Sequence, residues 1–153
     1  MYDFSMQRTR SSTPCLGICS TTYGDDVCRG CKRFVHEVIN WNSYKSDEKE
    51  SVNSRLEQFK CTILKDKFAI IDANLFAKKL HENSIIFNDS LKPLTWIFDL
   101  LRASGSQSLN LEDFGVKVLP AFDQVPLHEL KNAINLEFFE LSQAHFDRYF
   151  ISD

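Results

Sequence analysis

The sequence predicts a mainly α-helical protein, in which an N-terminal four-cysteine metal knuckle precedes a small helical bundle with a long C-terminal helix. Three observations predict this fold class. Four of the five cysteines fall within residues 15–31, apolar residues recur at helical spacings through most of the remaining chain, and few segments could form strands. With 153 residues, 43% of them hydrophobic, the chain can bury a sizeable core.

We expect three parts along the chain. Residues 1–13 are polar and predict a flexible arm. Residues 14–60 would form a Cys-rich metal-binding module with its first helices, and residues 61–153 a mostly helical C-terminal domain.

The cysteines form two close pairs, Cys15-Leu-Gly-Ile-Cys19 and Cys28-Arg-Gly-Cys31, with eight residues between them. Two such pairs can bring four sulfur atoms into one small volume, as a tetrathiolate metal site requires. In the cytoplasm thiols stay reduced, so close pairs there are metal ligands more often than disulfides, which would require an exported protein. We therefore predict that these four cysteines bind a metal.

The pattern does not distinguish a zinc ion from an iron–sulfur cluster, because four thiolates give the same total charge with Zn²⁺ and with a [4Fe–4S]²⁺ cluster. Gly17 and Gly30 permit the turns that such sites need. Arg29, Lys32 and Arg33 would offset the charge of the thiolates around either metal.

Two helices and a possible short strand are predicted directly after the cysteines. A short helix over 34–42 would pack against the knuckle, and a longer helix over 46–64 begins at Ser46 as its N-cap and carries one apolar face. Residues 67–72 could form a short strand, and residues 85–87 are a second short apolar run.

Three more helices complete the bundle. Asp72 would cap the first of them, and a strongly apolar helix over 93–103 would be capped by Asp89 or Ser90. The last and clearest helix spans 126–150. Its apolar stripe consists of Leu127, Leu130, Ile134, Phe138, Leu141 and His145. A flanking face with Phe139, Phe146 and Phe150 belongs to the core or to a partner surface, and the core reading is favoured.

Composition and missing motifs exclude several functions. The net charge of −3 argues against a general nucleic-acid-binding protein, since such proteins carry a basic excess. We expect a cytoplasmic protein without membrane association, because no targeting signal and no apolar run of membrane-spanning length are visible. No catalytic motif is found, so no catalytic residue is assigned and a non-enzymatic role is favoured. Cys61 stands apart and reads as an inert buried thiol.

The residues around the cysteines resemble a small bacterial family. The resemblance is carried by Pro14-Cys-Leu-Gly-Ile-Cys19, Cys28-Arg-Gly-Cys31, Glu37-x-x-x-Trp41 and Ser46-Asp-Glu-Lys49, and it covers about Thr13 to Phe59. This family is catalogued as a domain of unknown function (DUF1289) and is often labelled a predicted iron–sulfur protein. The resemblance implies that Cys15, Cys19, Cys28 and Cys31 are the ligands, and it implies no activity. Lys32-Arg33-Phe34 stands where many relatives have Gly-Arg-Thr, a departure that removes no ligand.

Three functions follow from these observations. The first is a metal-stabilised interaction module whose helical body contacts a protein partner. The second is an iron–sulfur protein that transfers electrons or senses oxidants. The third and weakest is a zinc knuckle that contacts RNA. Its basic residues would be Arg29, Lys32 and Arg33, and its stacking groups Tyr23, Phe34 or Trp41.

Overall fold

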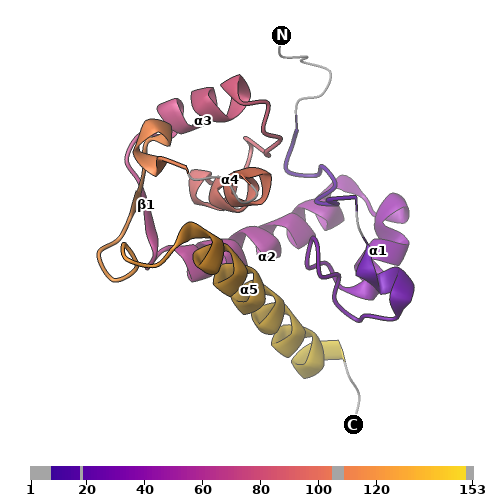
Figure 1. Cartoon of the computed structure of the whole chain (residues 1–153). Helices are drawn as coiled ribbons and strands as arrows, with labels where there is room; N and C mark the ends of the chain where they lie inside the picture. The colour runs from indigo at the N-terminus through magenta and orange to yellow at the C-terminus, as the bar shows by residue number, and fades with distance from the viewer. Residues whose placement is uncertain (1–7, 18, 105–108, 151–153) are drawn as a thin grey trace.

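The structure is a computed structural model that describes residues 8–17, 19–104 and 109–150. It is mainly α-helical, which confirms the predicted fold class (Figure 1). The helices are α1 (Val35–Asn40), α2 (Ser46–Leu64), α3 (Ala73–Glu82), α4 (Trp96–Ser104) and the long C-terminal α5 (Leu127–Phe150). The strands are β1 (Phe68–Ile70) and β2 (Val116–Val118). Short 3₁₀ turns lie at Ser20–Tyr23, Trp41–Ser43, Pro93–Thr95 and Leu111–Phe114.

Two of the predicted helix caps differ from those observed. Asp72 caps α3 as predicted, because its Oδ1 accepts a hydrogen bond from the Leu75 N–H at 3.0 Å. Ser46, in contrast, is the first residue of α2 and not its N-cap. Neither Asp89 nor Ser90 caps the turn that leads into α4. The Glu57 carboxylate of α2 accepts the Lys92 N–H there at 2.8 Å, so another helix supplies the acceptor.

The sheet pairs β1 with a strand that the sequence pattern did not indicate. β1 and β2 run antiparallel, with Phe68 opposite Val118 and Ile70 opposite Val116. Residues 85–87 form no strand, and Phe87 instead packs its ring against Trp96. β2 is only three residues long, too short for its Val-Lys-Val alternation to predict a strand without its partner.

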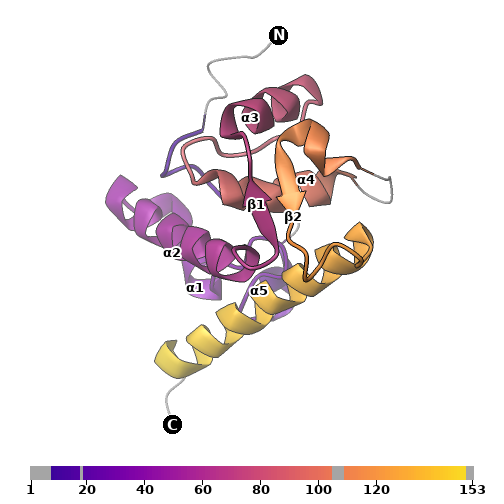
Figure 2. The same cartoon turned by 90° about the vertical axis from the view of Figure 1, so that its left-hand side faces the viewer.

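One main core joins the two parts that the sequence divides at residues 60 and 61. α2 runs across this boundary, and α5 packs against both α2 and α4 (Figures 1 and 2). Trp41 and Leu56 from the first part share the core with Leu100 and Phe138 from the second. A smaller cluster, in which Val27 and Phe34 contact Phe146, attaches the cysteine-rich segment to the C-terminal half of α5.

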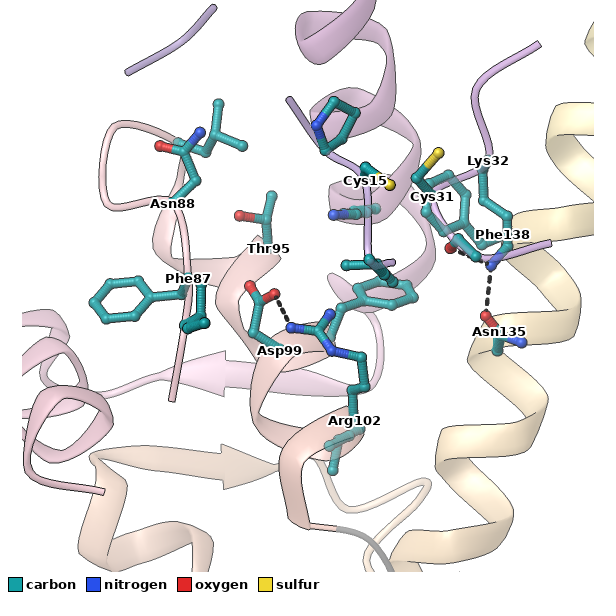
Figure 3. A pocket seen from close by; sticks show the side chains of 18 of the residues that line it. Cys15, Cys31, Lys32, Phe87, Asn88, Thr95, Asp99, Arg102, Asn135 and Phe138 are labelled. Atoms are coloured by element: carbon teal, nitrogen blue, oxygen red, sulfur yellow. Dashed lines mark hydrogen bonds and ion pairs between the residues drawn. The ribbon is translucent and has the colours of Figure 1, made fainter. Parts of the chain in front are cut away.

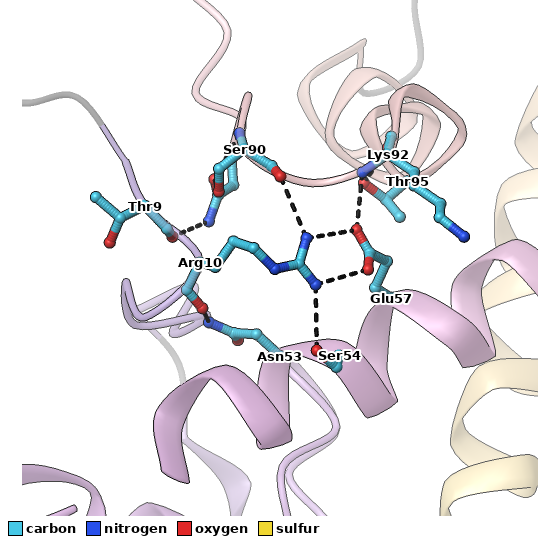
Figure 4. Close-up of polar contacts among 9 residues, drawn as sticks. Thr9, Arg10, Asn53, Ser54, Glu57, Ser90, Lys92 and Thr95 are labelled. Atoms are coloured by element: carbon cyan, nitrogen blue, oxygen red, sulfur yellow. Dashed lines mark hydrogen bonds and ion pairs between the residues drawn. The ribbon is translucent and has the colours of Figure 1, made fainter. Parts of the chain in front are cut away.

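Residues 8–13 lie along α2 and the loop before α4 (Figure 4). The Arg10 guanidinium donates to both Glu57 carboxylate oxygens at 2.9 and 3.2 Å and to the Ser90 carbonyl at 3.3 Å. The Asn53 amide donates to the carbonyls of Arg10 and Ser12. The flexible arm was predicted for residues 1–13. Residues 1–7 lie outside the described residues, and residues 8–13 are held by these contacts.

Candidate metal centre

Cys28 and Cys31 lie on a tight buried turn. Their side chains are 1% and 6% exposed. The Cys28 N–H donates to the Arg33 carbonyl at 2.9 Å, and the Lys32 N–H donates to the Cys28 carbonyl at 2.8 Å. Lys32 closes the turn with φ 66°, in the left-handed region where a glycine would fit without strain. Lys32 is thus a non-glycine residue in a conformation that favours glycine.

Backbone N–H groups surround the sulfur of Cys28. Burial alone would raise the pKa of this thiol from its ordinary 9.0. Hydrogen bonds from the backbone N–H groups of Cys31, Ser20 and Gly30, together with the Cys31 thiol, bring the pKa down to about 7. Such a nest of N–H groups stabilises the thiolate form at Cys28.

Cys31 has a different environment. Burial raises the pKa of its thiol. The Arg33 Nε donates a hydrogen bond to the sulfur at 3.2 Å, which acts to lower the pKa but does not outweigh burial. The same guanidinium lies over the Trp41 ring, 4.8 Å from its centroid. Arg33 is thus a buried cation that contacts the second cysteine of the pair directly.

Lys32 is also buried, and it links the turn to α5. Its Nζ donates to the carbonyls of Arg29 and Gly30 and to the Asn135 Oδ1 at 2.7 Å (Figure 3). Burial lowers the pKa of Lys32 to about 8. Since an ammonium group has three hydrogens, these contacts satisfy it completely.

The first cysteine pair is more accessible. Cys15 is exposed, and its sulfur accepts the Gly17 N–H at 3.3 Å, while Gly17 has φ 94°. Cys19 is half-buried, and its sulfur lies 2.8 Å from the Thr21 hydroxyl. Both sulfurs therefore contact small polar groups of their own turn.

The two pairs are brought to one side of the molecule. Ser20 follows Cys19, and its hydroxyl accepts a hydrogen bond from the Arg29 N–H at 2.8 Å. The backbone N–H of Ser20 donates a hydrogen bond to the Cys28 sulfur. Cys15 and Cys31 line the same cavity (Figure 3). In residues 8–17, 19–104 and 109–150, no disulfide joins any of the five cysteines, and no three His, Cys, Asp or Glu side chains lie close enough together for a metal ion. The structure thus places Cys28 beside Cys31, and a four-cysteine ligand set stays a prediction.

Glu37 and Arg55 attach the module to α2. The Glu37 carboxylate accepts the Phe34 N–H at 2.8 Å and both terminal nitrogens of Arg55. The Arg55 guanidinium lies 4.0 Å from the centroid of the Phe34 ring. Sequence reasoning missed Arg55 and Asn135, because a polar residue on a helix gives no sign of which distant backbone it will contact.

Several weaker candidates have clear environments. Cys61 is half-buried, and burial raises the pKa of its thiol, as expected for an inert cysteine. Of the residues considered for RNA contact, Lys32, Arg33, Phe34 and Trp41 are buried, while Arg29 and Tyr23 are exposed. The described surface therefore does not favour base stacking on this turn.

Within the described part of the chain, none of the helices combines the length and the apolar composition that a membrane span needs.

Comparison with known proteins gives a family for the N-terminal part. Residues 13–60 match the model of the family described as "Protein of unknown function (DUF1289)". No curated protein and no solved structure matches the chain. The matched segment holds all four predicted ligands and ends within α2, and the resemblance seen in the sequence is confirmed. Residues 13–60, which match this family of unknown function, are called the DUF1289 segment below.

Proposed function

We propose that this protein is a metal-stabilised interaction module. Cys15, Cys19, Cys28 and Cys31 would hold a zinc ion or an iron–sulfur cluster, and the helical body would contact a protein partner in the cytoplasm. The observation that carries the proposal is the environment of the Cys28 sulfur, which receives several backbone N–H groups inside a buried turn.

The half-buried Cys61, which is not among the predicted ligands, offers the comparison. At Cys61 burial raises the pKa of the thiol, and no backbone donor opposes this effect. At Cys28 the N–H groups of Ser20, Gly30 and Cys31 outweigh a similar burial effect. A metal ligand must be a thiolate, so an environment that favours the thiolate supports a ligand role for Cys28. At Cys31 burial raises the pKa, and the hydrogen bond and charge of Arg33 act against that effect.

The donor set fits a thiolate-bound centre. Thiolate sulfur is the ligand type that zinc and iron–sulfur clusters prefer. The buried cations Arg33 and Lys32 lie beside Cys31 and would offset the excess negative charge of several thiolates. Cys15 and Cys19 would complete the set from the more accessible first turn. The bound centre would supply folding free energy to the N-terminal segment.

A structural role is favoured over a catalytic one. A zinc ion with four thiolates has no open coordination position for a substrate. Exposed apolar side chains at the end of the molecule where α1 meets α5, namely Ile39, Tyr149 and Phe150, support a surface for a protein partner.

Matched cysteine substitutions test the proposal. We expect Cys28→Ser to lose the bound metal and to increase amide hydrogen exchange across residues 14–45, because the metal no longer constrains that segment. Cys61→Ser is the control and should retain both the metal and the exchange protection. Brown anaerobic protein whose visible absorption bleaches on reduction would identify a cluster and favour the redox function, whereas colourless protein with stoichiometric zinc identifies the structural ion. Equal metal content in the Cys28→Ser and Cys61→Ser variants would contradict the proposal.

A further inference from the structure

A cavity of about 530 Å³ lies between the cysteine-rich turn, α2, α4 and α5 (Figure 3). Its lining combines residues from the DUF1289 segment, such as Cys31 and Lys60, with residues such as Asp99 and Phe138 that lie outside it. The cavity therefore exists only where the C-terminal helices meet the family segment. Its volume is that of a site for a small organic molecule.

One part of the lining is apolar and aromatic. Phe98 and Leu101 of α4 and Ile134 and Phe138 of α5 contribute to the lining. The Phe98 and Phe138 rings are in edge-to-face contact, with their centroids 5.3 Å apart. This wall would contact the apolar body of a ligand and hold it by burial of its surface.

The charges in the lining are strongly one-sided. The chain has a net charge of −3, but among the described residues that line the cavity six are Lys or Arg and one, Asp99, is acidic. These cations are Arg8, Arg29, Lys32, Lys60, Arg102 and Lys131. Such a concave basic surface attracts anions.

Some of these cations already have partners. Arg102 pairs with Asp99 at 3.0 Å, and Arg29 pairs with Asp25 at 3.4 Å. Lys60 differs, because its Nζ lies over the Phe98 and Phe138 rings, at 5.5 and 5.8 Å from their centroids. No described residue forms an ion pair with Lys60 or with Lys131. Asp99 of the same lining acts on the charge of Lys60. It does not form a close ion pair with Lys60 in the described part of the chain, so the Lys60 ammonium group lies on the apolar wall without a directly contacting carboxylate.

We propose that this cavity binds a small organic anion, a carboxylate or phosphate ester with an apolar body. Lys60 and Lys131 hold the anionic group, while Phe98 and Phe138 contact the apolar body. Inorganic phosphate would leave the aromatic wall without a partner, and an uncharged apolar molecule would leave the two ammonium groups without one. The four residues assigned to the ligand lie on α2, α4 and α5 and are not among the four cysteines of the proposed metal centre.

Binding of a fluorescent probe to the full chain tests the proposal. Anilinonaphthalene sulfonate has an aromatic body and one negative charge, and N-phenyl-1-naphthylamine is its uncharged counterpart. We expect saturable binding of one anionic probe per chain, weaker binding of the uncharged probe, and displacement by decanoate or 1-naphthyl phosphate but not by inorganic phosphate at the same concentration. Equal affinity for the two probes, or equal displacement by inorganic phosphate, would overturn the proposal.

Substitutions locate the probe. Lys60→Met keeps most of the side-chain length and should weaken binding of the anionic probe by about tenfold or more, because a charge-assisted contact is lost. Lys131→Gln provides a second variant on a different helix, with the same expected direction. Lys117→Gln, an exposed cation on β2 outside the cavity lining, should leave the affinity unchanged. Near-ultraviolet circular dichroism checks that each variant is folded. Folded Lys60→Met and Lys131→Gln variants that both bind like the parent protein would show that the probe does not use this cavity.

Discussion

Glu57 is a nearly buried carboxylate of α2 that joins three parts of the chain. It pairs with Arg10 from the N-terminal segment and accepts the Lys92 N–H before α4 (Figure 4). Burial acts to raise the pKa of Glu57, but the hydrogen bonds and charges of Arg10 and Lys92 prevail and hold the pKa below its ordinary 4.5. The ionised carboxylate is therefore part of the folded structure.

Replacing Arg10 should give a pH-dependent loss of stability. A carboxylate whose pKa is lower in the folded than in the unfolded state stabilises the fold above the unfolded pKa, and this contribution disappears as the pH falls through the folded pKa. We expect Arg10→Ala to lower the free energy of unfolding by about 1–2 kcal/mol at neutral pH. The difference from the parent protein should shrink as the pH falls below 4.5. Urea denaturation at several pH values measures it. Arg8→Ala is the control, since Arg8 donates a hydrogen bond to the exposed Thr13 carbonyl and forms no ion pair with Glu57 in the described part of the chain. A pH-independent Arg10→Ala effect would refute the ion-pair explanation.

Gly115 is a position where the backbone needs glycine for two reasons. Its φ is 71°, and a Cβ atom there would lie 2.7 Å from the Asp72 carbonyl oxygen. Gly115→Ala should therefore destabilise the protein by at least about 2 kcal/mol, from backbone strain plus the steric clash. Gly24 also has a positive φ but open space around it, so Gly24→Ala should cost about 1 kcal/mol. Thermal denaturation of the two variants compares them, and similar losses would show that the close approach to Asp72 is unimportant.

At the scale of whole elements, α5 is the helix on which both the core and the candidate sites depend. Its inner face buries Leu130, Ile134 and Phe138 in the main core, and Phe146 joins the cluster with Val27 and Phe34. Of the predicted stripe, Leu130, Ile134 and Phe138 are therefore buried, while Leu127 and Leu141 are half-buried. Phe146 belongs to the predicted flanking face and is buried, as the core interpretation of that face requires, whereas Phe150 of the same face is half exposed.

Two substitutions on α5 separate its inner and outer faces. Phe138→Ala should lower the free energy of unfolding by about 3–5 kcal/mol, because it removes a ring that is 2% exposed and leaves a cavity beside Phe98. Leu136→Ala changes a side chain that is 55% exposed and should cost less than about 0.5 kcal/mol. Chemical denaturation measures both. A small loss for Phe138→Ala would mean that α5 is not docked as described.

The sequence was informative about helices and much less about contacts between elements. The stripe on α5 and the cap at Asp72 were predictable, since both depend on residues a few positions apart. The pairing of β2 with β1 and the hydrogen bond from the Lys92 N–H to Glu57 could not be predicted, because in each case the partner lies far away in the sequence. The burial of Lys32 was also unforeseen.

The same contrast between local and long-range features applies to the two candidate sites. The clustering of cysteines is visible in the sequence, and the tight turn at Cys28 follows from its local spacing. The cavity could not be predicted, because it lies between the family segment and helices that fold against it from far along the chain. Sequence patterns record local periodicity, whereas Lys60 and Phe138 meet only in the tertiary structure.

At the scale of the whole molecule, the DUF1289 segment and the C-terminal helices share one core. Trp41 lies in the matched segment and Trp96 begins α4, yet both belong to the same buried cluster. A shared core of this kind predicts that the two parts unfold together. Trp41→Phe leaves only the indole of Trp96, in the C-terminal helices. Trp96→Phe leaves only the indole of Trp41, in the DUF1289 segment.

We expect each remaining indole to report the same midpoint as far-ultraviolet circular dichroism of the same variant during thermal unfolding. Coincidence of the local and global probes is the mark of a cooperative transition. In either variant, an indole midpoint well separated from the dichroism midpoint would show that the two parts are independent units.

The metal and acid-labile sulfide content of the full chain, purified without oxygen, tests the central claim most directly. The account predicts a stoichiometric thiolate-bound centre, either one zinc ion per chain or iron together with sulfide, that is absent when Cys15, Cys19, Cys28 and Cys31 are all replaced by Ser. Anaerobic protein that is folded and carries no stoichiometric metal, even after incubation with zinc or with iron and sulfide, would contradict it.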